Sequence, residues 1–451
     1  MKIRSHRTSF AQQRLYFLQQ LEPWNSAYNM TETFRLRGDL RLDALSSALS
    51  LVADRHEMLR SRFLAVNGVP EQIILSDPRS SLLRMIDFTA YPLDAARRRA
   101  SSRIRTAAST PFNLHRGPLF CAELIRLPAD ESLLSLYMHH IISDGWSVKV
   151  ICDELSEIYQ ALVAERTVTL ADLPVDYVDF AAWEETMTGS AAIAAREDYW
   201  LRQLNGVPVV LAMPAGDDTA ETVSGRPGAI DFTISERLVT ALTRLAESLG
   251  VTPFVILFAA FQTALTSWTG QRDFLVGVPA AARRRLELQN VVGLFVNMLA
   301  IRSSVWGDPT FEELVQRVGA ASADAFENQD FPFQRLVELI NPPREPHTNP
   351  LVQVSFQLID DAMEGRLDLP GVDASRVYAL IDQTPFDLEV DVTARGGLLA
   401  CLLHYCGVRL HAKSVAQLSG LFETVIADAL TDPRRRVSEL GSSGSPAKAP
   451  R

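Results

Sequence analysis

Length is the feature that most constrains the fold of this chain, because 451 residues exceed what one hydrophobic core normally serves. Single cores stop growing at about 250–300 residues, and longer chains divide into domains. The sequence therefore predicts two domains, or two lobes that share an interface. We place the first lobe at residues 1–170 and the second at residues 171–440, with a proline-bearing connection at 167–174. The small and polar residues 441–451 are typical of a flexible linker.

Composition and charge exclude several classes of protein. Hydrophobic residues make up 47% and charged residues 22% of the chain, which are globular proportions. The net charge of −10 disfavours nucleic-acid binding, which needs a basic face. No run approaches the ~18 apolar residues of a membrane span, and the N-terminus lacks the apolar core of a signal peptide. Four cysteines without a CxxC pair do not make a disulfide framework. We therefore expect a cytoplasmic monomer that binds neither nucleic acid nor membrane.

The periodicity of apolar residues indicates a mixed α/β class, either α/β or α+β. In the first half, strands at 119–127 and 132–139 are separated by a polar turn and can form a hairpin. The second of these strands leads directly into the segment HHIISDGWS, and a helix is expected at 146–164. The second half alternates in the same way, for example with a helix at 236–249 and a strand at 273–278. A loop between a strand and a helix is a place from which side chains can project into a cleft.

The segment His139-His140-Ile-Ile-Ser-Asp144-Gly145 is the strongest chemical signal in the chain. A neutral imidazole is the side chain best suited to accept a proton near pH 7. The alternative is that both histidines are structural and bonded to backbone groups at the strand end. Zinc binding is disfavoured, because adjacent strand residues point to opposite faces and no third ligand is apparent. One histidine is therefore expected to face a cleft and the other to pack inward.

Seven segments, in the same order along the chain, resemble the signatures of the condensation domains of nonribosomal peptide synthetases. They are SFAQQRLYFLQQLEP at 9–23, RHEMLRSRF at 55–63, MHHIISDGWS at 138–147, YVDFAAWEE at 177–185, GVPAAARRR with VVGLFVNMLAIR within 277–302, NQDFPFQRLVELI at 328–340 and HTNPLVQVSFQL at 347–358. The resemblance covers nearly the whole chain. It implies two lobes, each similar to chloramphenicol acetyltransferase, arranged in a V around a central tunnel.

The resemblance also implies roles for individual residues. His140 would be catalytic, and would position or deprotonate the attacking amine, with Gly145 lining the reaction centre. His139 would be structural, and Asp144 would be a buried acid whose partner Arg283 ties the two lobes together. Asn297 would belong to the loop that floors the cleft, or would be purely structural. Four further residues are candidate substrate contacts: Trp146, Lys149, Arg284 and Ser355. No metal is expected.

Some positions depart from the pattern of the family. Asn328 stands where histidine is usual and is therefore not expected to be catalytic, and Tyr16 stands where tryptophan is common. The chain keeps both histidines, which heterocyclising relatives replace by acids. Gly145-Trp146-Ser147 differs from the epimerising relatives. The opening segment resembles the classes that take an L-aminoacyl or a starter acyl donor.

The expected reaction joins an acyl thioester donor to the amine of an aminoacyl group on a carrier protein. Because Met1 lies only eight residues before the first signature, we expect a starter domain that N-acylates the first amino acid with a fatty acyl group from acyl-CoA, in lipopeptide or antibiotic biosynthesis. No cofactor would be bound permanently, since phosphopantetheine or CoA carries the substrates. The expected partners are a peptidyl carrier domain and an adjacent adenylation domain.

Three alternatives remain open at the level of sequence. The first is an elongation domain that uses a carrier-bound L-aminoacyl or peptidyl donor. The second is a freestanding acyltransferase of the HxxxD type that acts on a soluble amine or alcohol. The third is a non-catalytic platform that recruits tailoring enzymes, which the intact His140 disfavours.

Overall fold

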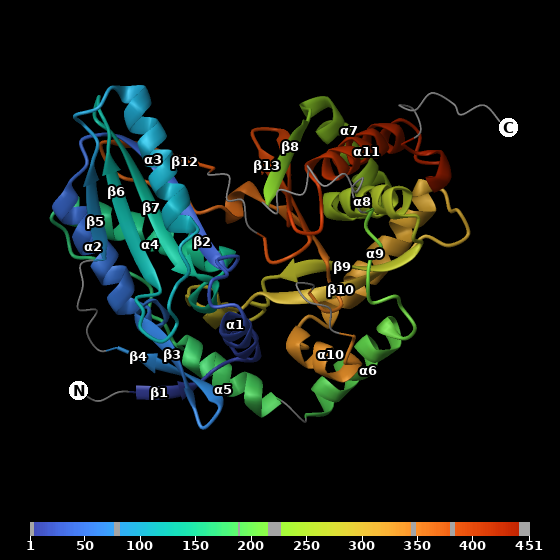
Figure 1. Ribbon diagram of the computed structural model, residues 1–451, viewed down its shortest axis with the longest axis horizontal. Coiled ribbons are helices and arrows are strands. Elements are labelled where there is room, and N and C mark those ends of the chain that lie inside the picture. Colours follow the sequence, from blue (N-terminus) through green and yellow to red (C-terminus); the bar gives the residue numbers. More distant parts are fainter. Residues whose placement is uncertain are drawn as a thin grey trace. The chain divides into compact units, whose positions relative to one another are not determined.

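The computed structural model describes residues 4–75, 82–187, 190–214, 227–343, 349–378 and 384–441 (Figure 1). They form two compact units. Unit 1 comprises Met1–Ser190, Ala281–Val296 and Ala362–Ile381, and unit 2 comprises Ala191–Ala280, Asn297–Asp361 and Asp382–Arg451.

These units differ from the expected division at residue 170. Unit 1 continues for a further 20 residues and takes back two segments from the second half of the chain. The reason is long-range pairing, which periodicity does not reveal. One returning segment adds an edge strand to the sheet of unit 1, and the other carries the partner of a buried acid. The expected linker at 441–451 lies outside the described residues apart from Gly441.

Unit 1 is built on a five-stranded sheet in which a late segment supplies the first strand. The expected hairpin is confirmed, because β6 and β7 pair antiparallel. β2 was not expected from the sequence, and it lies between β12 and β7. In spatial order the strands are β12 (Val372–Val377), β2 (Asn29–Gly38), β7 (Glu131–His139), β6 (Phe120–Arg126) and β5 (Leu83–Asp87).

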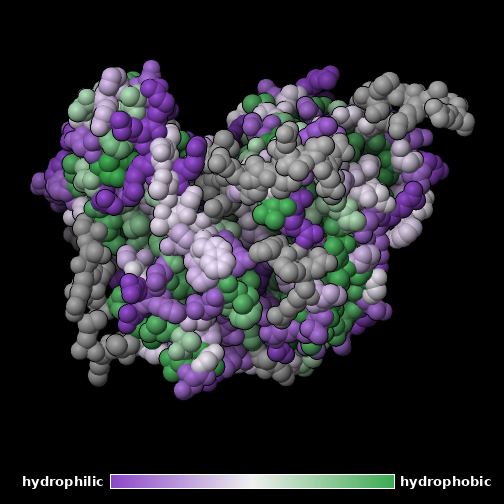
Figure 2. All heavy atoms as spheres, in the orientation of Figure 1, coloured by the Kyte–Doolittle hydropathy of each residue, from purple (hydrophilic) through white to green (hydrophobic). Residues whose placement is uncertain are grey.

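Alternate residues of β7 pack on different helices, as a two-faced strand requires. Leu134 and Leu136 join the core formed with α2 (Leu42–Arg55) and α4 (Gly145–Val163). Leu133 joins the smaller core under α3 (Leu93–Ala108). The outer side of α3 is polar, and hydrophilic side chains gather over it in Figure 2. The other elements of unit 1 are α1 (Phe10–Leu21), α5 (Tyr177–Met187) and a small sheet of β1 (Arg4–Arg7), β4 (Val69–Ile74) and β3 (Ser61–Val66).

Unit 2 is built on a six-stranded mixed sheet. One face is apolar and packs on helices, with Phe356 at its centre in contact with Phe258, Phe261 and Phe422. The strands in spatial order are β10 (Asn297–Ser304), β9 (Asp273–Ala280), β11 (Val354–Ile359), β13 (Leu388–Arg395), β14 (Leu398–Tyr405) and β8 (Gly228–Ile234). The helices are α6 (Ala191–Leu204), α7 (Glu236–Leu249), α8 (Pro253–Thr269), α9 (Phe311–Glu327), α10 (Phe333–Ile340) and α11 (Ala412–Thr431).

The helix expected at 236–249 has the predicted bounds, because its apolar stripe and the left-handed Gly250 at its end are local signals. Within the described residues, no single helix is long and apolar enough to cross a membrane. α7 and α8 pass that test only as a pair, bent by 104° at the break between them.

Candidate active site

The two histidines stand at the end of β7 and have different surroundings. His139 is the last residue of the strand, and its side chain is fully buried. Its Nδ1 accepts a hydrogen bond from the amide of Ile141 at 3.0 Å. Burial, and then the neighbouring His140, lower the pKa of His139 to about 3. His139 is therefore neutral and part of the interior, which fits the structural role expected for it.

His140 begins a 3-10 turn, His140–Ile142, and is only partly buried. Its Nδ1 lies 2.7 Å from the backbone oxygen of Ser143. Because a carbonyl oxygen can only accept a hydrogen bond, Nδ1 must carry the proton. The lone pair of the neutral ring is then on Nε2. Burial lowers the pKa of His140, and this effect outweighs the opposing charge of Asp144. His140 is thus a neutral imidazole held in one tautomer, which is the state of a proton acceptor near pH 7.

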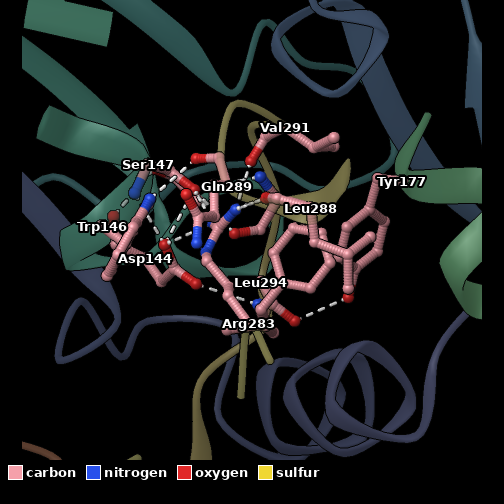
Figure 3. Close-up of polar contacts among 12 residues, drawn as sticks. Asp144, Trp146, Ser147, Tyr177, Arg283, Leu288, Gln289, Val291 and Leu294 are labelled. Atoms are coloured by element: carbon pink, nitrogen blue, oxygen red, sulfur yellow. Dashed lines mark hydrogen bonds and ion pairs between the residues drawn. The ribbon is translucent and has the colours of Figure 1, made fainter. Parts of the chain in front are cut away.

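Asp144 caps the N-terminus of α4 and is buried. Its Oδ1 accepts from the amide of Ser147 at 2.8 Å, and its Oδ2 accepts from the amide of Phe295 at 3.0 Å. Oδ1 also lies 3.0 Å from Nη2 of Arg283. Figure 3 draws the contacts of these two residues. A carboxylate with all of these donors is structural, because its lone pairs are already used.

Arg283 holds the returning segment 281–296 in place. Its Nη1 donates to the backbone oxygens of Leu288 and Val291 at 2.7 and 2.5 Å, while Nη2 donates to Asp144 and Ser147. The guanidinium carbon lies 4.0 Å from the ring centroid of Phe295. Burial lowers the pKa of Arg283, opposed by Asp144. Both members of the expected pair belong to unit 1. The pair therefore fixes segment 281–296 within that unit.

Three residues of this network were not singled out from the sequence. The hydroxyl of Ser147 lies 3.0 Å from the amide nitrogen of Gly293 and 2.9 Å from its oxygen. The hydroxyl of Tyr177 donates to the oxygen of Leu294 at 2.6 Å (Figure 3). A β-carbon on Gly293 would lie 2.0 Å from the Tyr177 ring, so only glycine fits there. Ser147 is the serine of the segment DGWS, and Gly293 is the glycine of the segment VVGLF. These two residues are 146 positions apart in the sequence, and only the fold brings them together.

Gly145 and Trp146 form the first turn of α4 beside the network. Gly145 is exposed, has no positive φ, and a β-carbon there would meet nothing within 4 Å. The absence of a side chain at Gly145 therefore leaves free space at the start of α4. Trp146 donates from Nε1 to the backbone oxygen of Gln289 at 2.7 Å. Because this contact holds segment 281–296, Trp146 has a structural role.

The remaining predicted residues do not join this network. In unit 2, the amide of Asn297 donates to the oxygens of Gln329 and Phe331 and accepts from the amide of Phe333, which is a structural arrangement. Ser355 is buried on β11 in unit 2. In unit 1, Lys149 forms an ion pair with Asp153 one turn along α4. Arg284 is exposed next to the buried Arg283. Within the described residues, no three His, Cys, Asp or Glu side chains are grouped as a metal site requires.

Comparisons with known proteins identify the family of this chain. The family model "Condensation domain" matches residues 4–448. One of the linear gramicidin synthase proteins of Brevibacillus parabrevis is 35% identical over 433 residues, which are 96% of this chain and 8% of that protein. Chondramide synthase cmdD of Chondromyces crocatus is 34% identical, with 96% of this chain and 11% of that protein covered. This chain therefore spans only about a tenth of the length of these relatives.

Solved structures share the mixed α/β fold. The X-domain from teicoplanin biosynthesis superposes with a TM-score of 0.86 and 25% identity, over 96% of this chain and 97% of that one. The first condensation domain of the calcium-dependent antibiotic synthetase has a TM-score of 0.82 and 23% identity, over 97% and 98% of the two chains. With nearly the whole chain matched in sequence, this chain belongs to the condensation-domain family of nonribosomal peptide synthetases, the acyltransferases that form amide bonds.

Proposed function

We propose that this chain joins an acyl thioester to the amine of an aminoacyl group held on a carrier protein, with His140 at the reaction centre. The observation that carries the proposal is the fixed tautomer of His140. Its Nδ1 is bonded to the oxygen of Ser143 at 2.7 Å, which leaves Nε2 with the lone pair. A lowered pKa keeps the ring neutral, so this nitrogen is ready to bind an N–H of the amine.

The amine nitrogen attacks the thioester carbonyl, and a C–N bond forms as the C–S bond breaks. The nitrogen loses one proton in this step. Nε2 of His140 takes that proton and returns it to the departing thiolate, so that the products are an amide and a free thiol. Gly145 is exposed within the same unit and carries no side chain, which leaves room for a thioester close to His140.

The acceptor carrier would dock on α1. Phe17, Leu21 and Trp24 are 51%, 57% and 73% exposed, and their spacing places them along one side of the helix and its exit. An exposed apolar stripe of this kind marks an interaction surface. α1 also packs against the 3-10 turn that begins with His140. A carrier bound to α1 could therefore deliver a phosphopantetheine arm to that histidine.

We propose a fatty acyl-CoA as the donor, which makes the chain a starter domain. The resemblance of the opening segment to starter and L-aminoacyl classes supports this. Arg284 and Arg285 are exposed beyond the buried Arg283, and both could meet phosphate groups of CoA. Lys149 is a weaker candidate, because Asp153 already neutralises it.

Two other functions have a specific observation in their favour. An elongation role, with a carrier-bound donor, is favoured by the relatives, which include two of the linear gramicidin synthase proteins. A recruiting platform is favoured by the similarity to a structure described as the complex of the X-domain and OxyB from teicoplanin biosynthesis, at 25% identity.

The test is the intact mass of an aminoacyl-loaded carrier domain after incubation with the chain and a panel of acyl-CoAs. Wild type is compared with His140→Ala, and with His411→Ala as a control histidine at the start of α11. We expect a mass gain of one acyl group with wild type and the control, and none with His140→Ala. A gain that persists in His140→Ala would overturn the mechanism. A gain only when a carrier-bound aminoacyl donor replaces acyl-CoA would favour elongation, and no gain with any donor would favour the platform.

A further inference from the structure

The 3-10 turn that begins with His140 packs against α1, and both elements belong to unit 1. Gln12 lies in the first turn of α1, and its side chain is fully buried. Its Nε2 donates to the backbone oxygen of Ile141 at 3.2 Å. Ile141 is the middle residue of the turn His140–Ile142. A side chain of α1 therefore reaches the backbone between His140 and Ser143, whose oxygen fixes the tautomer of the ring.

The side-chain amide of Gln12 is held in one orientation. Its Oε1 accepts from the backbone amide of Ser9 at 3.1 Å, as part of the capping box of α1. Its Nε2 also lies 3.5 Å from Oε1 of Gln72 on β4, which is fully buried as well. The amide of Ser9 can only donate and the oxygen of Ile141 can only accept, so a reversed side-chain amide would lose both bonds. Gln12 therefore directs its N–H group at the turn in a fixed way.

The backbone of Ile141 is bound at both of its polar groups. Its oxygen accepts from Gln12, and its N–H donates to Nδ1 of His139 at 3.0 Å. Because Nδ1 of His139 accepts, the proton of that neutral ring is on Nε2. This nitrogen lies 3.4 Å from Oε1 of Gln19, a second buried residue of α1. Two glutamines of one helix therefore hold the turn, one directly and one through His139.

We propose that Gln12 is a positioning residue for the condensation reaction, which holds the turn at Ile141 so that Nδ1 of His140 stays bonded to the oxygen of Ser143. This inference rests on the proposed function and adds a residue that acts on the same histidine without touching a substrate. The bond from Nδ1 to that oxygen is 2.7 Å long, and a shift of the backbone weakens it. The proton of the ring is then free to move to Nε2. A ring with its proton on Nε2 has no lone pair there to accept a proton from the amine.

The test compares two variants of Gln12 with a matched control. Gln12→Met keeps the length of the side chain and removes its N–H group. Gln12→Glu keeps an acceptor for the amide of Ser9, so the capping box remains, but its ionised carboxylate has no N–H for Ile141. The control is Gln160→Met near the end of α4, where Nε2 donates to the backbone oxygen of Asp368, also at 3.2 Å. We expect kcat to fall by about tenfold in both Gln12 variants, as loss of a buried hydrogen bond predicts. KM for the loaded carrier should stay unchanged, because a fully buried side chain does not touch the carrier. The control should change neither constant.

Nitrogen NMR of His140 gives a readout that does not depend on turnover. In wild type, Nδ1 should give the signal of a protonated nitrogen and Nε2 that of a bare one. In both Gln12 variants the two signals should move toward each other as the second tautomer is populated, while those of His411 in unit 2 stay in place. Unchanged signals of His140 in both variants, or a fall in kcat that Gln160→Met shares, would overturn the inference. If wild type condenses no substrate but the signals of His140 still move together in the variants, the proposed function fails and the positioning of His140 by Gln12 stands.

Discussion

Replacement of Arg283 by methionine is the sharpest test of how the active-site loop is held. The change removes four hydrogen bonds, two to the backbone oxygens of Leu288 and Val291 and two to Asp144 and Ser147. It also leaves Asp144 as a buried charge without a cation. Breaking one side of a buried ion pair costs about 3–5 kcal/mol. The amides of Ser147 and Phe295 still donate to Asp144, so we expect the lower part of that range.

Amide hydrogen exchange measures this loss of stability directly in segment 281–296. The amide of Gly293 donates to Ser147 and that of Phe295 donates to Asp144, so both become exposed when segment 281–296 detaches. A loss of about 3 kcal/mol should speed their exchange by a factor of about 10², because about 1.4 kcal/mol corresponds to tenfold. Condensation activity should fall in parallel, since the same network anchors the start of α4.

The matched control is Arg285→Met, on the same segment. Arg285 is exposed and stacks over Trp183 at 4.7 Å, a contact worth about 0.5–1 kcal/mol. Arg283→Lys should show an intermediate loss, because one ammonium cannot replace a fork that reaches four acceptors. Exchange at Gly293 and Phe295 that is unchanged in Arg283→Met, or equally changed in the Arg285 control, would refute the reasoning.

Three further predictions follow from the same contacts. Gly293→Ala should lower the free energy of unfolding by about 1–3 kcal/mol, because its β-carbon would overlap the buried Tyr177 ring; urea denaturation measures this, and an unchanged midpoint would contradict it. Burial raises the pKa of Glu184 from its ordinary value of 4.5 to about 7. The folded state therefore gains stability from the protonated carboxyl group; this gain is complete below pH 4.5 and is lost as pH rises through 7. Stability of wild type relative to Glu184→Gln should therefore fall by about 3 kcal/mol between pH 4.5 and 8, whereas a rise would refute the assignment. Because the neutral ring of His140 is the active form and its pKa is lowered, kcat/KM should decline only below pH 6.5, and an inflection above that value would argue against His140 as the base.

Local signals in the sequence were sufficient for much of the fold. α7 has the bounds that its periodicity predicts, and the β6–β7 hairpin follows from two apolar runs and a polar turn. The strands β1, β2, β3, β10 and β12 were missed. β12 has no alternating burial pattern of its own and exists because it pairs with β2 across more than three hundred residues. Pairing of this kind depends on the partner strand, so a local pattern carries no trace of it.

The sequence by itself determined the family, the order of its motifs and the identity of His140 as the residue of interest. Only the tertiary structure decided which nitrogen of His140 is free, since the oxygen of Ser143 fixes the tautomer. It also decided that Arg283, 139 residues after Asp144, pairs with it inside the same unit. The physical reason is common to both. Tautomer and ion pairing depend on which atoms lie a few ångströms away in space. Neither the direction of the Ser143 oxygen nor the return of Arg283 to Asp144 can be read from the order of the residues.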